Sequence, residues 1–179
     1  MKAFNGTFEH NLDAKNRLFV PAEFKQNFEG RLTVRLKLSK YPRIECILEN
    51  DFDAVVEKEM EAAEKSGRSA ELQNSISRAY SKTIPLDGGG RICMPSMLLK
   101  KAGITKEAIF FGKGSYFEVW NPEAYDEYLM SLAEIAMEQE QAENEERIKF
   151  NQFRSAGCFI EIKNTLGIKD GISTQERNA

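Results

Sequence analysis

Two short segments of this sequence place an aspartate four residues before an arginine, inside an otherwise apolar run. They extend from Asp13 to Arg17 and from Asp87 to Arg91. An apolar run that stops for a few polar residues and then resumes is typical of two strands joined by a tight hairpin. The aspartate can accept hydrogen bonds from the turn amides. The arginine then stands at the hairpin tip, where its planar fork of donors suits a guanine edge or a phosphate group.

The two segments belong to an internal repeat. Residues 12–21 align without gaps on residues 86–95, and the two stretches share a leucine, the aspartate, the arginine and a proline. We expect a short amphipathic helix after each proline, over residues 22–28 and 96–102, and two strands after each helix. These strands are expected at Leu32–Leu38 and Cys46–Leu48 in the first repeat, and at Ala108–Phe111 and Tyr116–Trp120 in the second. Each repeat therefore has the order strand, turn, strand, helix, strand, strand.

The two loops differ in the residues that would allow a left-handed backbone. The second loop contains Gly88, Gly89 and Gly90, and glycine adopts positive φ angles without steric cost. In the first loop Asn16 stands at the position of Gly90, and asparagine tolerates the left-handed region better than other non-glycine residues. The loops are therefore expected to share one backbone conformation. Lys15 adds a cation to the first loop.

Helices are expected outside the two repeats. Residues 52–64 and 70–80 have helical spacing, and Pro122 is expected to begin a long helix that ends near Phe150. From Asn151 onward, apolar residues and glycines follow no clear period. The expected domains are the first repeat at 7–53, a helical connector at 54–80, the second repeat at 81–124, and a C-terminal helix and tail at 125–179.

Charge is unevenly distributed along the chain, whose formal net charge is -3. Residues 1–43 contain nine Lys and Arg against four Asp and Glu. Acidic residues concentrate at 45–64 and 121–146, which we expect to be solvated helix faces. Because affinity for phosphate depends on the local field, the basic first part remains compatible with binding to nucleic acid.

The sequence offers little support for an enzyme. His10 is the single histidine, and Cys46, Cys93 and Cys158 are widely separated, without the spacing of metal ligands or of a disulfide framework. No pairing of a nucleophile with a base is visible. We therefore expect no catalysis, metal, cofactor or small-molecule substrate. No apolar run is long enough to span a bilayer, so we expect a cytoplasmic protein with reduced cysteines and no membrane partner.

Together these features resemble the MraZ family. The stretch from Phe4 to Lys25 is similar to the opening of MraZ proteins. The segments Leu86–Leu99, Lys101–Glu107 and Phe117–Trp120 are similar to their second repeat. The resemblance covers roughly residues 1–132. Two positions depart from the usual pattern, because Asn16 replaces a glycine and Lys25 stands where an arginine is common.

The resemblance implies an α+β fold, mainly β with helices, in which tandem SpoVT/AbrB-type swapped-hairpin units form a double-split β-barrel with a C-terminal helix. It implies a ring-shaped homo-oligomer that is associated with the nucleoid and regulates transcription of the division and cell-wall gene cluster. Such a protein binds short G-rich direct repeats in double-stranded DNA upstream of its own gene. Carried over to this sequence, Arg17 is the chief DNA contact, and the other candidate residues are Asp13, Lys15, Asn16, Asp87 and Arg91.

Three alternatives remain open from the sequence. The aspartate and arginine of each loop can form ion pairs that only hold the hairpins. An AbrB-like antitoxin or transition-state regulator would share the repeat unit and bind DNA, although such proteins usually carry one unit per chain. A structural or enzyme-modulating oligomer would have no affinity for DNA.

Overall fold

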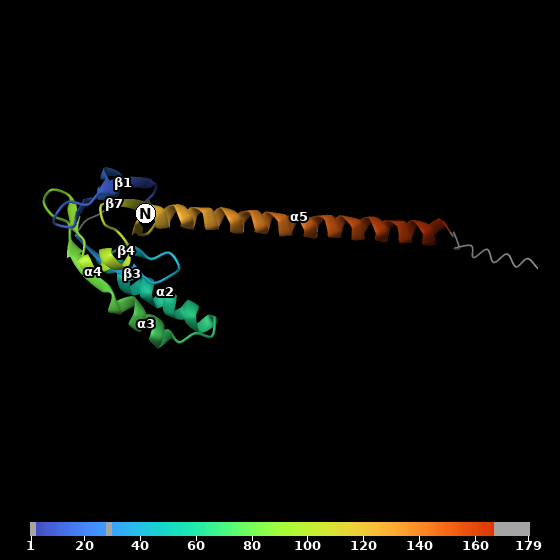
Figure 1. The fold of residues 1–179 in the computed structure, drawn as a ribbon. Coiled ribbons are helices and arrows are strands. Elements are labelled where there is room, and N and C mark those ends of the chain that lie inside the picture. Colours follow the sequence, from blue (N-terminus) through green and yellow to red (C-terminus); the bar gives the residue numbers. More distant parts are fainter. Residues whose placement is uncertain (1–2, 28–29, 167–179) are drawn as a thin grey trace, which may run out of the picture. The chain divides into compact units, whose positions relative to one another are not determined.

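The computed structural model describes residues 3–27 and 30–166 (Figure 1). The chain divides into two compact units, residues 1–130 and residues 131–179. The first unit contains strands β1 to β8 and helices α1 to α4, together with the first turns of α5. The described part of the second unit is helical.

Each repeat forms the predicted order of elements. The first repeat forms β1 (Thr7–Asn11), β2 (Arg17–Phe19), α1 (Ala22–Lys25), β3 (Arg31–Lys37) and β4 (Arg43–Leu48). The second forms β5 (Ser81–Pro85), β6 (Arg91–Cys93), α4 (Ser96–Lys101), β7 (Glu107–Gly112) and β8 (Phe117–Trp120). Between the repeats lie η1 (Glu49–Asp51), α2 (Phe52–Lys65) and α3 (Ala70–Ala79), and α5 (Pro122–Leu166) follows β8.

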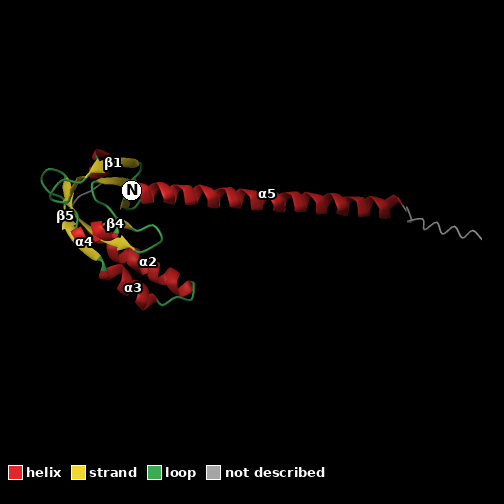
Figure 2. Ribbon diagram, in the orientation of Figure 1, coloured by secondary structure: helices red, strands yellow, loops and turns green. Residues whose placement is uncertain are grey.

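The strands of the two repeats are interleaved rather than packed as separate domains. The main sheet has the order β1-β7-β8-β4-β3-β5, and β2 pairs with β6 in a separate two-stranded ribbon. Figure 2 shows the strands in yellow and helices α2 and α3, which lie side by side, in red. The first strand of each repeat is antiparallel to the third strand of the other, as in the pairings of Phe8 with Phe110 and of Ile84 with Leu32. This exchange confirms the α+β fold of swapped hairpins that the resemblance implied.

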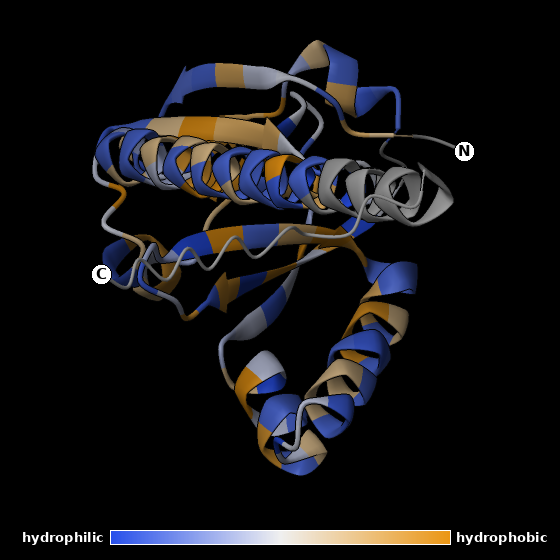
Figure 3. Ribbon diagram, turned by 90° about the vertical axis from the view of Figure 1, so that its right-hand side faces the viewer, coloured by the Kyte–Doolittle hydropathy of each residue, from blue (hydrophilic) through white to orange (hydrophobic). Residues whose placement is uncertain are grey.

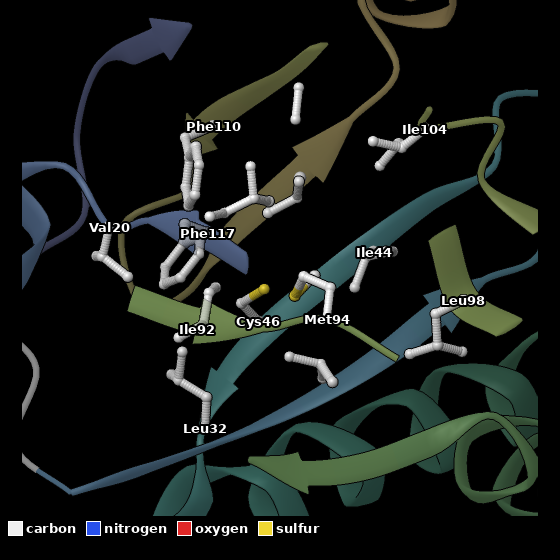
Figure 4. Packing of buried hydrophobic residues seen from close by; sticks show 14 of the residues in the cluster. Val20, Leu32, Ile44, Cys46, Ile92, Met94, Leu98, Ile104, Phe110 and Phe117 are labelled. Atoms are coloured by element: carbon white, nitrogen blue, oxygen red, sulfur yellow. The ribbon is translucent and has the colours of Figure 1, made fainter. Parts of the chain in front are cut away.

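The hydrophobic core fills the space between one face of the main sheet and the ribbon. Alternate side chains of β3, β4, β7 and β8 point into it, because successive residues of a strand face opposite sides. They meet Leu18 and Ile92 from the ribbon and Phe24 from α1, all with no exposed surface. Phe110 and Phe117 lie here together with Ile92 (Figure 4), so these strand aromatics form part of the core. The core therefore ties the ribbon, and the loops that it carries, to both repeats.

The opposite face of the main sheet is covered by helices. Ile47 of β4 packs against Phe52 and Val56 of α2. Over β7 and β8, Trp120 packs against Tyr125 and Tyr128 from the start of α5. Both faces of the central strands are therefore covered. Along α2 and α3, hydrophobic and hydrophilic residues follow one another (Figure 3). The helix that follows each repeat covers strands of that same repeat.

A charged network is buried beneath α2, where the sequence predicted only solvated acidic residues. Arg35 of β3 is 2% exposed and donates from Nε to Glu45 of β4 at 2.7 Å. Its two Nη atoms donate to Glu59 of α2 at 2.9 and 2.8 Å. The expectation of solvated helix faces for residues 45–64 is therefore wrong at Glu45, which is 2% exposed and lies in a strand.

Helix α5 is longer than the sequence predicted. The expected end was near Phe150, but α5 continues to Leu166. Loss of apolar periodicity suggested the earlier end, yet a helix needs only acceptable local propensity and the absence of proline to continue. Gly157 is the one glycine between Pro122 and Leu166, and a single glycine costs only about 1 kcal/mol. Across the described residues, no helix combines the length and apolar character needed to cross a bilayer.

Candidate nucleic-acid interface

The first loop is organised around the carboxylate of Asp13. Asp13 Oδ1 accepts hydrogen bonds from the backbone N–H groups of Lys15 at 2.8 Å and Arg17 at 2.9 Å. Asp13 Oδ2 accepts a third from Arg17 Nε at 2.7 Å. The expected turn bonds to the aspartate are therefore present, and so is the ion pair that the sequence left as an alternative.

The second loop repeats this arrangement bond for bond. Asp87 Oδ1 accepts from the N–H groups of Gly89 and Arg91, each at 2.9 Å, and Asp87 Oδ2 accepts from Arg91 Nε at 2.9 Å. Asn16 has a φ of 57° and Gly90 a φ of 76°, so both occupy the left-handed region. Two different sequences thus adopt one loop backbone, as predicted.

The loop geometry lowers the pKa of both aspartates. The backbone N–H of Arg17 is the main cause at Asp13, with its side chain and the Lys15 N–H adding to it, and the pKa of Asp13 falls to about 2. The N–H of Arg91 leads the same effect at Asp87, whose pKa is also lowered. Both carboxylates are therefore ionised at neutral pH, and hydrogen bonding to the charged form is the cause.

The arginines keep donors for a ligand. Each uses Nε for its aspartate, and among the described residues none accepts a hydrogen bond from the Nη atoms of Arg17 or Arg91. Their side chains are 29% and 28% exposed. Each ion pair therefore fixes the direction of a guanidinium without using the pair of Nη groups that suits bidentate recognition.

The β2–β6 ribbon brings the two loops onto one surface. Arg17 pairs with Cys93 across the ribbon, and Phe19 pairs with Arg91. Just beyond the strands, Met94 N donates to Asn16 O at 2.9 Å and Val20 N donates to Gly90 O at 3.1 Å. We call the outer face of this ribbon with residues 13–17 and 87–91 the loop surface. It contains all six residues predicted as contacts.

Phe19 of the loop surface and Lys25 beside it were not predicted as contacts from the sequence. Phe19 is 51% exposed, and the alternation of β2 places it on the same side as Arg17, while Leu18 points into the core. Lys25 of α1 places its Nζ 5.9 Å from the centre of the Phe19 ring. The alternation along β2 was a usable signal for Phe19. Lys25 also lies against Gly90 of the second loop, and nothing in the sequence indicated this contact with the other repeat.

The described residues offer no alternative metal chemistry. No cluster of three or more His, Cys, Asp or Glu side chains among them is arranged to hold a metal ion. His10, on β1, instead packs edge-on against Phe110 with ring centres 5.4 Å apart. Burial, together with the charge of nearby Lys25, lowers its pKa.

Comparison with known families agrees with this arrangement. The sequence model of the family described as "MraZ protein, putative antitoxin-like" matches residues 3–71 and 79–148 of the chain. The two matched segments contain the two repeats and therefore both loops. The chain belongs to the MraZ family.

Individual MraZ relatives cover a similar part of the chain. The protein named Transcriptional regulator MraZ from Hydrogenovibrio crunogenus is 30% identical over 132 residues, which is 70% of this chain and 84% of that protein. The protein of the same name from Ureaplasma parvum is 31% identical, over 72% of this chain and 88% of its own length. That from Anaeromyxobacter dehalogenans is 31% identical, over 76% and 94%. The membership places this chain among transcriptional regulators, while the part of α5 after residue 148 lies outside the matched MraZ segments.

Proposed function

We propose that this MraZ protein binds double-stranded DNA through the loop surface and regulates transcription of the division and cell-wall gene cluster. Its sites would be short G-rich direct repeats upstream of its own gene. The main support is the pair of matching loops, which present two oriented guanidinium groups on one exposed ribbon. The names of its MraZ relatives support a role in transcription rather than catalysis.

Recognition begins with the two Nη groups of Arg17. A guanine presents O6 and N7 as adjacent acceptors in the major groove, and one guanidinium can donate to both. Asp13 holds Nε and the backbone, so little side-chain entropy is lost when the bond to the base forms. Lys15 stands beside this arginine in the exposed loop and supplies a contact to a phosphate, which fixes position rather than sequence.

Assembly into a ring would multiply these contacts. One loop surface makes few bonds and would bind weakly by itself. Linking several surfaces raises the effective concentration for every contact after the first. Direct repeats in the DNA fit such a protein, because each repeat offers a site to one of the linked loop surfaces once the first has bound. We therefore propose a homo-oligomeric ring that occupies several boxes together.

The first test compares two duplexes of equal length. One carries the DNA immediately upstream of the gene, and the other is its scrambled sequence. We expect tighter binding to the first duplex, and we expect affinity for both to fall as salt rises, because cations on the protein release counterions from DNA. Fluorescence anisotropy measures both effects, and mass measurement in solution reports the oligomer. Absence of salt-dependent binding to either duplex would refute the proposal and favour an oligomer without DNA affinity.

Replacing Asp13 tests the positioning role of the carboxylate. Simple electrostatics predicts that Asp13→Ala strengthens binding, because a negative charge leaves a surface that faces phosphates. We expect the opposite for the upstream duplex, a loss on the order of tenfold, because Arg17 loses its orientation and one base contact is worth about 1–3 kcal/mol. Affinity for the scrambled duplex should hold or rise. Tighter binding to both duplexes would show that Asp13 does not position Arg17.

A further inference from the structure

The second loop obtains its extra cation from the first repeat. Where the first loop has Lys15, the second has glycine, and Lys25 at the end of α1 lies against it instead. A Cβ atom built on Gly90 would lie 2.6 Å from Lys25 Cε and would collide with Lys25 Nζ. The Lys25 side chain therefore occupies the space that a side chain at this position would fill. Asn16 occupies the matching position of the first loop, so the two loops are not interchangeable.

Arg91 points its guanidinium at the same part of the loop. Arg91 Nη2 lies 3.2 Å from the position that a Cβ on Gly89 would take. The two cationic groups thus lie over adjacent glycines, one from each repeat. No described residue accepts a hydrogen bond from Lys25 Nζ or from the Arg91 Nη atoms, while Arg91 Nε is held by Asp87.

Phe19 contacts both cations. The centre of its ring is 5.4 Å from Arg91 Cζ and 5.9 Å from Lys25 Nζ. An aromatic face attracts cations and offsets part of the repulsion between two like charges held close together. This accounts for a phenylalanine that remains half exposed in the middle of a basic surface.

We propose that Lys25, Arg91 and the backbone of Gly88–Gly90 form a subsite that binds one phosphate of the DNA backbone. Two converging cations suit a phosphate, and glycines without side chains allow the sugar-phosphate chain to approach closely. Asp87 carries one negative charge, but its oxygens are directed into the loop by three hydrogen bonds, and the two cations leave the subsite with a net positive charge. The subsite rests on the proposed function, because it requires a duplex against the loop surface.

The two loops then have different tasks. Arg17 faces Cys93 across the ribbon, and among the described residues no aromatic ring lies over its guanidinium. Its Nη groups are therefore open to a base edge in the direction that Asp13 fixes, whereas Arg91 lies against the Phe19 ring beside a second cation. The first loop would discriminate between sequences, and the second would hold the backbone in register.

The test uses the variants Lys25→Ala and Arg91→Ala. Each is measured with the upstream and the scrambled duplex, and both duplexes are shortened to the length of one direct repeat. Because a phosphate contact carries no sequence information, each variant should lose affinity by the same factor on both duplexes, on the order of three- to tenfold. The slope of log affinity against log salt should fall by about one for each phosphate that the variant no longer binds. Phe19→Leu keeps the apolar bulk without the ring, and we expect a smaller loss with the same pattern. Lys113→Ala is the matched control, because Lys113 Nζ lies 5.1 Å from the Phe111 ring in a similar cation–π contact outside the two loops.

Two results would overturn the subsite. If Arg91→Ala weakens only the upstream duplex, Arg91 recognises a base. If neither variant changes affinity or salt slope, no phosphate is bound there. Failure of the proposed function has a different signature. A wild-type protein that binds both duplexes equally would refute sequence recognition. The equal loss of affinity for both duplexes in Lys25→Ala and Arg91→Ala would still be measurable in that case.

Discussion

Arg17→Ala is expected to remove most of the preference of this MraZ protein for its upstream DNA. One base contact is worth about 1–3 kcal/mol, or about 5- to 150-fold in affinity, and the effect grows with the number of loop surfaces that bind together. The core does not depend on this side chain, because Leu18 and Phe24 hold the ribbon from below. Oligomer mass and thermal stability should therefore stay unchanged. Anisotropy with both duplexes measures the change in preference.

Two further variants sharpen this experiment. Arg17→Lys keeps the charge but loses the planar pair of donors, so it should retain binding to scrambled DNA and lose the preference for the upstream duplex. Lys65→Ala removes one exposed cation from the end of α2, outside the loop surface, and should change neither. Full preference for the upstream duplex in Arg17→Ala would exclude Arg17 from sequence recognition.

Arg35→Ala is expected to cause the largest loss of stability. The substitution removes the partner of two carboxylates, and one of them, Glu45, is 2% exposed and pairs across the sheet with Glu118, which is 1% exposed. Removing one member of a buried ion pair typically costs about 3–5 kcal/mol, because the other charge stays buried without compensation. Urea denaturation measures the free energy of unfolding. Arg31→Ala is the control on the same strand: its 3.9 Å pair with Glu49 is exposed and should contribute less than about 1 kcal/mol.

The same network predicts how stability depends on pH. Burial alone would raise the pKa of Glu59, but hydrogen bonds and charge from Arg35 and Lys37 outweigh it and lower the pKa from 4.5 to about 2. A folded-state pKa below the unfolded value means that the contribution is complete above about pH 4.5 and is lost as pH falls towards 2. Glu59→Gln should therefore lose less stability than the wild type between about pH 6 and pH 3. Equal acid sensitivity of the two proteins would show that Glu59 does not stabilise the fold through its charge.

The repeat and its loops could be predicted from the sequence because they depend on local rules. Asp13 and Asp87 precede their arginines by the spacing that a carboxylate needs to bond the turn amides, and the left-handed position requires glycine or asparagine whatever lies around it. The strands followed from alternation, and α2 and α3 followed from helical spacing. The end of α5 was missed because the apolar period disappears before the helix does.

The sequence by itself thus determined two copies of one hairpin unit, each with a guanidinium at its tip. The family resemblance implied that hairpins from the two copies are exchanged, but only the tertiary structure decided which strands pair and in which register, since hydrogen bonding between distant strands leaves no local mark in the sequence. That exchange pairs Phe19 with Arg91, brings Lys25 against Gly90 and buries Arg35 between Glu45 and Glu59. Charge and exposure depend on which distant residues become neighbours, and for that reason the basic loop surface and the buried ion pairs could be assigned only from the folded chain.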